Sequence, residues 1–477
     1  MSRAIKTRFA PSPSGDIHPG NVRTALFSAL LAAQQQGVFL LRIEDSDAQR
    51  SDPDVITRLL ADLRWLGLDW QEGEGIGGCA APYRQSQRAA IYQQQFAALQ
   101  AAGAAYPCFC SSERLAQLRT AQRAAGQPPR YDGCCAALDA ATVAARLAAG
   151  EPAALRFRVP TGEQVSFVDG VRGVQQVATD TLGDFIIRRA DGSPAFFFAN
   201  AVDDALMEIT DVVRGEDHLS NTARQLLLLA ALDLTPPRYY HLPLLVATDG
   251  AKLSKRHGSR SLRELRSAGY LPQALLNYLA RLGHTFESDR LCSFAQLAAA
   301  FDTARIGRAP AKFDDEQLRY WQRQALEQLD EASLWAWIDV ADQALVPPHQ
   351  QHPFIHAIRA NTLFPAQAGE WARRLFTDPL IPSDHARAAL LAAPPSLFSA
   401  ALTALDQHPT DFRALAAAVK AATGLGGKKL FLPLRAALTG ESDGPEMAQL
   451  LPLLGVERAR ERLQDALAAL ACAVETY

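Results

Sequence analysis

The sequence contains no long run of apolar residues. No stretch approaches the roughly 18 consecutive apolar residues of a membrane-spanning helix, and the N-terminal MSRAIKTRF lacks the apolar segment of a secretory signal. Only seven cysteines occur in 477 residues, too few for a disulfide framework in a chain of this length. These absences argue against a membrane protein and against a disulfide-rich secreted protein. They predict a cytoplasmic location, where cysteines stay as thiols or bind a metal.

No single sign of charge dominates the sequence. The formal net charge is −3, so no overall field attracts a polyanion. Any nucleic-acid binding therefore depends on local basic patches, and one such patch contains Lys255, Arg256, Arg260, Arg263 and Arg266. Lysine itself is scarce, with only seven in the chain, yet Lys252 and Lys255 both fall in the pentapeptide KLSKR.

The first 45 residues have the pattern of a βαβ unit. Residues 5–9 predict a strand, residues 21–36 place apolar side chains at helical spacing, and Gly37 marks the expected end of that helix. Residues 38–43 form a continuous apolar run typical of a buried parallel strand, and they lead into the acidic stretch EDSD. Open α/β sheets bind ligands at the carboxyl ends of their strands. We therefore expect a ligand site between EDSD and the loop APSPSGDIHPGN at residues 10–21.

This loop combines three prolines and two glycines with one histidine, His18. A loop with few bulky side chains lets a ligand approach the backbone, and the N-terminus of the following helix favours an anionic phosphate. His18 and Asn21 can each donate a hydrogen bond to a phosphate oxygen. Pro19 fits the first helical position, where a missing N–H costs little. The alternative interpretation is a plain turn that carries a surface histidine.

The length of the chain is enough for about three domains. Residues 106–180 break the α/β pattern with short alternating runs and clustered cysteines, which predicts an inserted α+β domain. The strand-like FFFANAVDD at 196–204 and the apolar helix after it predict that the α/β domain then resumes. From about residue 320 the sequence has almost no strand pattern, so we expect a helical C-terminal region.

Two signatures carry a family resemblance. The loop at residues 10–21 resembles the H-x-G-H loop of class I aminoacyl-tRNA synthetases in the form of the glutamyl enzymes, and GAKLSKRHG at 250–258 resembles their K-M-S-K-S loop. Further stretches resemble the same family in the same order: RIEDSD (42–47), ANAVDD (199–204), VVRGEDHLSNT (212–222), LPQALLNYLARLG (271–283) and GLGGKKLFLPLRAALTG (424–440). Over nearly its whole length the chain is therefore similar to the bacterial-type glutamyl-tRNA synthetases.

The resemblance implies a multidomain fold. It has a Rossmann-like α/β catalytic domain in two halves (1–105 and 183–240), an α+β insertion that binds the acceptor stem (106–182), a region with the KLSKR loop and stem contacts (241–320), and an all-α anticodon-binding region (321–477). In that last region Lys428, Lys429 and Arg435 are candidate anticodon contacts.

The implied reaction is ATP-dependent ligation of L-glutamate to its tRNA through glutamyl adenylate, with release of AMP and pyrophosphate. Mg²⁺ is expected to accompany ATP. Whether tRNA for glutamine is charged as well stays open. We further expect a monomer, and the lack of a long apolar run predicts no membrane partner.

Residue roles are also implied by the resemblance. The implied catalytic groups are His18, Asn21, Lys252 and Lys255. ATP contacts are implied for Pro11, Gly20, Asp217, Leu244 and Lys255, and glutamate contacts for Arg8, Ser12, Glu44, Phe196, Asn200 and Arg214. Arginine suits such a role because it binds a carboxylate in planar, two-pronged geometry, although Arg214 and Glu44 would equally make a structural ion pair. Phe196 departs from the family, whose members often carry a tyrosine there.

The cysteines at Cys108, Cys110, Cys134 and Cys135 resemble a zinc site that some members of the family carry. The family pattern ends in C-x-H, and Ala137 stands at the histidine position here. Cys134 would then supply the fourth thiolate of a tetrahedral structural zinc site. The alternative is four free thiols.

Two rival functions remain at this point. One is an enzyme of related chemistry, either a nucleotidyltransferase with the same histidine loop or a short paralogue that glutamylates a tRNA base. The other is a catalytically silent tRNA-binding protein, which the intact His18 and KLSKR do not favour.

Overall fold

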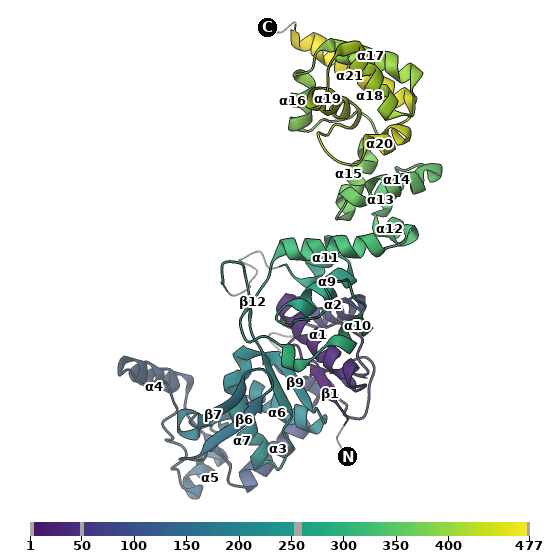
Figure 1. Ribbon diagram of the computed structural model, residues 1–477. Helices are drawn as coiled ribbons and strands as arrows, with labels where there is room; N and C mark the ends of the chain where they lie inside the picture. The colour runs from purple at the N-terminus through teal and green to yellow at the C-terminus, as the bar shows by residue number, and fades with distance from the viewer. Residues whose placement is uncertain (1–3, 48–51, 252–259, 475–477) are drawn as a thin grey trace. The chain divides into compact units, whose positions relative to one another are not determined.

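The computed structural model describes residues 4–47, 52–251 and 260–474. The chain forms two compact units. The first comprises residues 1–266 and 272–318, and the second comprises residues 267–271 and 319–477. Figure 1 labels many of the elements of both units along the chain. Among the described residues, no single helix is long and apolar enough to cross a membrane. Two consecutive helices, Asp384–Leu391 and Pro395–Gln407, are long and apolar enough together, but the chain bends sharply between them.

A seven-stranded sheet organises the first unit (Figure 1). The strand order is β3-β2-β1-β9-β10-β6-β7, and every neighbouring pair is parallel except the β6–β7 hairpin. The strands are β1 (Lys6–Phe9), β2 (Val38–Leu41), β3 (Glu72–Gly73), β6 (Gln164–Asp169), β7 (Gly173–Ala178), β9 (Asp211–Gly215) and β10 (Arg238–Leu242). The predicted βαβ unit is confirmed, because β1 and β2 pair in parallel on either side of helix α1 (Pro19–Gln34).

Helix α1 ends at Gln34, and Gly37 takes part in its C-terminal capping as expected, because the Gly37 N–H donates to the carbonyl oxygen of Ala32 at 2.8 Å. The left-handed residue after the helix is Gln36, with φ 51°. Gly37 is also needed for a close approach, since a Cβ there would lie 2.1 Å from the carbonyl oxygen of Ile5. That same oxygen accepts a hydrogen bond from Val38 N at 2.9 Å, so the glycine lets β2 begin directly beside β1.

The expected strand at 196–204 is wrong, because these residues form helix α6 (Phe196–Leu206). Phe198, Ala199 and Val202 pack at helical spacing into a core cluster with Phe96 and Leu228. Asn200, Asp203 and Asp204 are buried as well. A short apolar run does not distinguish a buried strand from a buried helix. Here the helix places Asp203 against the buried Arg88, and Asp204 against the buried Arg8 and Arg42.

The segment between the halves of the large sheet contributes to two sheets. A three-stranded antiparallel sheet contains β4 (Ala105–Cys108), β5 (Ala154–Phe157) and β8 (Phe185–Arg188), with helices α4 (Ser112–Ala124) and α5 (Ala140–Ala148) beside it in sequence. The β6–β7 hairpin from the same segment joins the large sheet, where Asp169 pairs with Tyr239 of β10. Asp169 thereby comes next to residues near the carboxyl ends of β9 and β10.

The remaining helices and strands of the first unit complete its core and edges. They are α2 (Pro53–Trp65), α3 (Ala89–Ala101), α7 (Leu219–Ala231), α8 (Leu262–Ser267), α9 (Pro272–Arg281), α10 (Phe294–Ala300), and the parallel pair β11 (Leu245–Val246) and β12 (Ala311–Lys312).

The second unit is helical throughout its described residues, as expected from the sequence. Its helices are most of α11 (Asp315–Gln328), then α12 (Glu331–Trp337), α13 (Val340–Gln343), α14 (Gln351–Ile358), α15 (Pro365–Phe376), α16 (Asp384–Leu391), α17 (Pro395–Gln407), α18 (Phe412–Thr423), α19 (Lys428–Thr439), α20 (Met447–Leu454) and α21 (Val456–Val474). Apolar side chains from most of these helices form one large core cluster, with Phe354, Leu397 and Phe398 fully buried. Two smaller clusters lie beside it in the same unit, one with Leu326, Leu334 and Ile355 and one with Ala386, Ala389 and Ala436.

Candidate active site

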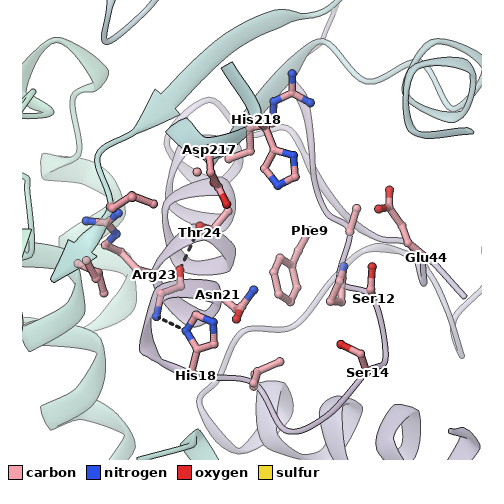
Figure 2. Close-up of a pocket in the computed structure, with 18 of the residues that line it drawn as sticks. Phe9, Ser12, Ser14, His18, Asn21, Arg23, Thr24, Glu44, Asp217 and His218 are labelled. Carbon is pink, nitrogen blue, oxygen red and sulfur yellow. Dashed lines mark hydrogen bonds between the residues drawn. The ribbon is translucent and has the colours of Figure 1, made fainter. Parts of the chain in front are cut away.

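A cleft of about 520 Å³ opens where β1, β2, β9 and β10 end and α1 begins. Figure 2 shows side chains from these segments around it, including His18, Glu44 and His218. The structure brings every described candidate for the catalytic, ATP and glutamate sites to this cleft: Arg8, Pro11, Ser12, His18, Gly20, Asn21, Glu44, Phe196, Asn200, Arg214, Asp217 and Leu244. The other two candidates, Lys252 and Lys255, lie outside the described residues.

His18 is the N-cap of α1. Its Nδ1 accepts a hydrogen bond from the backbone N–H of Gly20 at 3.1 Å, as Figure 2 shows. A neutral imidazole whose Nδ1 accepts carries its proton on Nε2, so the ring has a donor of known position. Pro19 occupies the first helical position, as the sequence predicted. Gly20 is constrained by the ring, because a Cβ there would lie 3.0 Å from His18 Cε1 and 3.1 Å from Nδ1.

Arg8 and Glu44 belong to a buried ion-pair network. Arg8 donates to both carboxylate oxygens of Asp204, at 3.1 and 3.3 Å. Arg42, which is fully buried, donates to Asp204 at 2.7 Å and to Glu44 at 2.9 Å. Asn200 Nδ2 donates to the same Glu44 oxygen at 2.7 Å. Sequence reasoning missed Arg42 and Asp204, although both lie in quoted family stretches.

Burial shifts the protonation of this network. Burial raises the pKa of the Glu44 carboxyl, and the Arg42 guanidinium offsets part of that rise. Burial also opposes the charge on Arg42, but the carboxylates of Asp204, Glu44 and Asp203 outweigh it and raise the Arg42 pKa. An additional cation beside Glu44, such as an ammonium group, would therefore stabilise the carboxylate form.

Arg214 differs from Arg8 because its described partners are all neutral. Its Nε donates to His241 Nε2 at 3.0 Å, and its Nη2 donates to Thr222 Oγ1 at 2.7 Å and Gln225 Oε1 at 2.8 Å. Burial lowers the pKa of Arg214 to about 10, which still leaves it charged near neutral pH. In the described part of the chain no carboxylate pairs with Arg214. The alternative of a structural ion pair between Arg214 and Glu44 is therefore wrong. A buried guanidinium of this kind favours a bound carboxylate.

Phe196 and His218 form another wall of the cleft. Their ring centroids lie 5.5 Å apart. Burial, followed by the nearby Arg214, lowers the pKa of His218 to about 4, so this histidine is neutral near pH 7. Its buried Nδ1 has no hydrogen-bond partner within the described structure. Sequence reasoning did not single out His218. Its position directly after Glu216 and Asp217, in the VVRGEDHLSNT stretch that resembles the family, could have marked it as a site residue.

The four cysteines of the insertion gather at one place, together with a tyrosine. Cys110 Sγ lies 3.3 Å from Cys134 Sγ and 3.6 Å from Cys135 Sγ, and Cys108, Cys110 and Cys135 form a group whose sulfur atoms could hold a metal ion. The Tyr131 hydroxyl lies 3.4–3.5 Å from the sulfurs of Cys108, Cys110 and Cys134. Sequence reasoning gave no role to Tyr131, which lies in the stretch RYDG at 130–133, directly before Cys134 and Cys135.

Two arginines also contact this cysteine cluster. Arg156 Nε donates to Cys108 Sγ at 3.1 Å, and Arg114 Nη1 donates to Cys110 Sγ at 3.4 Å. Burial and the neighbouring thiols raise the pKa of Cys110 to about 12, although the hydrogen bond with the Tyr131 hydroxyl lowers it in part. Cys110 would therefore hold a protonated thiol unless a metal ion stabilises its thiolate.

In the helical unit the three basic candidates have different surroundings. Lys428 and Lys429 are exposed in the first turn of α19. Arg435 is partly buried and donates to the carbonyl oxygen of Pro445 at 2.9 Å, so it has a structural contact within its own unit.

Comparison with known proteins gives consistent matches along the chain. Residues 4–320 match the family model described as tRNA synthetases class I (E and Q), catalytic domain, and residues 354–467 match the model described as anticodon binding domain. The chain is 56% identical over 462 residues to glutamate–tRNA ligase 2 of Nitrosococcus oceani, covering 97% of this chain and 98% of that one. It is 54% identical to glutamate–tRNA ligase 1 of Halorhodospira halophila, covering 97% and 96%.

A solved structure has the same fold. The crystal structure of a glutamate tRNA ligase from Elizabethkingia meningosepticum, in complex with its amino acid, superposes with a TM-score of 0.87 at 29% identity. The match covers 98% of this chain and 100% of that one.

Proposed function

The chain belongs to the class I tRNA synthetases of the glutamate and glutamine type, and on that premise we propose how its residues carry out the reaction. The activity is ATP-dependent aminoacylation of tRNA with glutamate. The observation that supports the residue assignment best is Arg214, a buried guanidinium with only neutral partners at a cleft that also holds a helix N-terminus.

In the first step a carboxylate oxygen of glutamate attacks the α-phosphorus of ATP, and pyrophosphate leaves. Such a step depends mainly on positioning and on stabilising charge at the phosphate oxygens. We assign His18 Nε2–H and the Asn21 amide to these oxygens, at the N-terminus of α1 where the helix dipole favours an anion. Mg²⁺ enters with ATP as part of the substrate. Pro11, Gly20, Asp217 and Leu244 line the space assigned to ATP.

Lys255, assisted by Lys252, is assigned to the phosphates as charge develops in the transition state. A lysine is a compact cation on a flexible stem, which suits a group that follows moving charge.

Glutamate is assigned to the other side of the cleft. Arg214 binds a carboxylate of the substrate and Glu44 binds its α-ammonium group, with Ser12 and Asn200 adding polar contacts. Arg8 contributes positive charge, while its own hydrogen bonds to Asp204 keep it in place. Glutamine lacks the second carboxylate, so it would leave the charge of a buried arginine unmet.

The experiment that tests the assignment is pyrophosphate exchange in the presence of glutamate, ATP and tRNA. Lys255→Ala is expected to lower the exchange rate by two orders of magnitude or more, roughly, since a transition-state contact is lost. The same variant is expected to bind tRNA almost as well as the wild type. A mild kinetic effect would contradict the assignment of Lys255, and a wild-type chain that binds tRNA without exchange would support the silent tRNA-binding protein.

For tRNA, we propose that the insertion at 106–182 binds the acceptor stem and that the helical region reads the anticodon, with Lys428 and Lys429 as exposed candidates. Charging assays with purified tRNA for glutamate and tRNA for glutamine will show whether the second is also a substrate.

We also propose that the protein is a monomer, which size-exclusion chromatography tests.

The cysteine cluster fits a structural zinc ion. Two thiolates bound to one tetrahedral zinc at about 2.3 Å lie about 3.8 Å apart, close to the 3.3–3.8 Å among Cys110, Cys134 and Cys135. We propose that Cys108, Cys110 and Cys135 are ligands. The fourth is Cys134, as the sequence suggested, or Tyr131, whose hydroxyl lies among the same sulfurs.

Metal analysis of protein purified without chelators tests this site. Near-stoichiometric zinc is expected, and its absence would contradict the proposal. Loss of zinc in Cys134→Ser but not in Tyr131→Phe would identify Cys134 as the fourth ligand, and the reverse result would identify Tyr131. Cys79→Ser is the matched control, since Cys79 is an exposed cysteine outside the cluster.

A further inference from the structure

The role proposed for Arg214 leaves the side chains behind it without a function. Arg214 on β9, His241 on β10 and Asp169 at the end of β6 follow one another away from the cleft. Arg214 Nε donates to His241 Nε2 at 3.0 Å, and His241 Nδ1 contacts Asp169 Oδ2 at 2.6 Å. All three side chains belong to residues at most 5% exposed. A buried line of hydrogen bonds therefore runs from β6 to the cleft.

The direction of donation in this line is determined by chemistry. Arginine nitrogens only donate, so His241 Nε2 must accept, and the imidazole proton then sits on Nδ1. Asp169 selects this tautomer because its carboxylate accepts from Nδ1. Asp169 also accepts from the backbone N–H groups of His241, Val171 and Arg172 at 2.7–3.3 Å, which holds the carboxylate in one orientation.

The line fixes which edge of Arg214 faces a ligand. His241 holds Nε, while Thr222 and Gln225 hold Nη2. Thr222 Oγ1 also contacts His241 Nε2 at 3.1 Å, so these partners support one another. Among the described residues, no acceptor contacts Nη1, and Arg214 lines the cleft. Nη1 is thus the edge that a substrate carboxylate can use.

We propose that Asp169 and His241 are positioning residues for glutamate, which hold the Arg214 guanidinium in the orientation that binds the substrate carboxylate. This inference rests on the role proposed for Arg214 and adds two residues that do not touch the substrate. Asp169 acts through the tautomer of His241, and His241 acts by accepting from Arg214 Nε. A protonated His241 would instead turn an N–H toward the guanidinium, and the contact would become repulsive.

The surroundings of His241 keep it neutral near pH 7. The titratable and charged groups that face it are Asp169 from β6, Arg214 from β9, Arg8 from β1 and His218 after β9, with the Tyr239 ring 6.0 Å away. Burial lowers the pKa of His241, Asp169 offsets part of that fall, and Arg214 and Arg8 lower the pKa again. Below that pKa the proposed arrangement is lost, so glutamate affinity should fall on acidification.

Two substitutions of His241 in the full-length enzyme separate the accepting atom from the rest of the ring. In His241→Gln the side-chain oxygen takes the place of Nε2, cannot titrate and can still accept from Arg214. In His241→Asn the side chain ends near the position of Nδ1, so it reaches Asp169 but not Arg214. In pyrophosphate exchange with tRNA present, we expect His241→Asn to raise the KM for L-glutamate about tenfold or more, which is the effect of losing a hydrogen bond to a charged group.

His241→Gln is expected to keep the KM for glutamate within about threefold of the wild type. It should also remove the rise in this KM that the wild type shows as pH falls. The KM for ATP should stay nearly constant in both variants, because the line contacts only the glutamate side of the cleft. A purely structural role would change both KM values and kcat together, and it would leave the pH profile unaltered.

Asp169→Asn tests the other end of the line. The amide can donate to Nδ1 and so stabilise the opposite tautomer, which turns an N–H toward Arg214. We expect a rise in the KM for glutamate comparable to that of His241→Asn. Asp211→Asn is the matched control, because Asp211 on β9 is equally buried but contacts Arg238, Tyr240 and Thr210 instead. It should leave the KM for glutamate unchanged.

Arg214→Ala distinguishes failure of this inference from failure of the proposed function. If Arg214→Ala raises the KM for glutamate strongly but His241→Asn and Asp169→Asn leave it near the wild-type value, the positioning role is wrong and the role of Arg214 stands. If Arg214→Ala has no effect on this KM, the role proposed for Arg214 fails and the inference fails with it.

Discussion

At the residue scale, three buried arginines line the cleft, and two of them, Arg8 and Arg214, differ in the partners that meet their charge. Arg8 is paired with the carboxylate of Asp204 inside the protein, whereas Arg214 has three neutral acceptors and a pKa lowered by burial to about 10. Removing a partner from a buried charge is costly, so the unpaired guanidinium gains most from a carboxylate ligand. This difference is the reason why we assign Arg214 to bind a substrate carboxylate and give Arg8 only a supporting positive charge.

A prediction at this scale concerns Gly20. In Gly20→Ala the new Cβ would crowd the His18 ring at 3.0–3.1 Å and displace Nδ1 from the backbone N–H that it caps. Loss of a cap costs about 1 kcal/mol, and alanine recovers a similar amount through its helix propensity. We therefore expect the free energy of unfolding to change by less than about 1 kcal/mol, while pyrophosphate exchange falls about tenfold because His18 no longer points correctly.

Thermal unfolding and exchange assays on the same preparation check this separation. Gly307→Ala is the control, since its Cβ would meet only Gly283 O at 3.7 Å. Unchanged exchange in Gly20→Ala would show that the orientation of His18 is unimportant.

At the element scale, the turn from α1 to β2 depends on two adjacent residues, one with a left-handed backbone and one that has no room for a side chain. Gln36 adopts the left-handed conformation that glycine prefers, and Gly37 approaches the backbone of Ile5 more closely than any side chain allows. The turn brings Val38 into register with Lys6 in the parallel sheet. The βαβ unit that carries the loop at residues 10–21 is therefore anchored here.

This turn yields a paired prediction. Gly37→Ala should destabilise the protein by about 2–3 kcal/mol, because a Cβ 2.1 Å from a carbonyl oxygen forces β2 away from β1. Gln36→Gly should stabilise it by up to about 1 kcal/mol through relief of the left-handed strain. Denaturant unfolding of both variants measures whether each change lowers or raises the free energy of unfolding. An unchanged free energy of unfolding in Gly37→Ala would mean that β1 and β2 can move apart without loss of stability.

At the scale of the whole molecule, buried neutral histidines link the stability of the first unit to pH. Burial lowers the pKa of His218 to about 4 and also lowers the pKa values of His241 and His284. An unfolded chain binds these protons near pH 6.5, whereas the folded unit does not. Below pH 6.5 the unfolded state therefore binds more protons, and stability falls as pH falls.

We expect each such histidine to remove about 1.4 kcal/mol per pH unit between pH 6.5 and its own lowered pKa. Calorimetry between pH 7 and pH 5 should show a falling unfolding temperature for the first unit. His284→Gln should have a shallower pH dependence than the wild type, because its amide does not titrate. An equal slope in both proteins would show that His284 is already protonated in the folded unit.

The sequence by itself determined the order of the elements around the cleft. Two apolar strand-like runs on either side of a segment with helical apolar spacing predicted the βαβ unit. Pro19 was correctly predicted at the first position of α1. Local propensity and fixed motifs settle such features, because each depends on residues near one another in the chain. The order of the quoted stretches likewise predicted the family.

Only the tertiary structure decided what lies behind each functional residue. Asp169 and His241 are 72 residues apart, and Arg214 is 27 residues from His241, yet parallel pairing of β6, β10 and β9 joins them in one buried line. The same holds for Asp204, which became visible as the partner of Arg8 only when 196–204 proved to be a helix. Hydrogen bonds between distant strands leave no periodic trace in a sequence, because their geometry depends on sheet order and register.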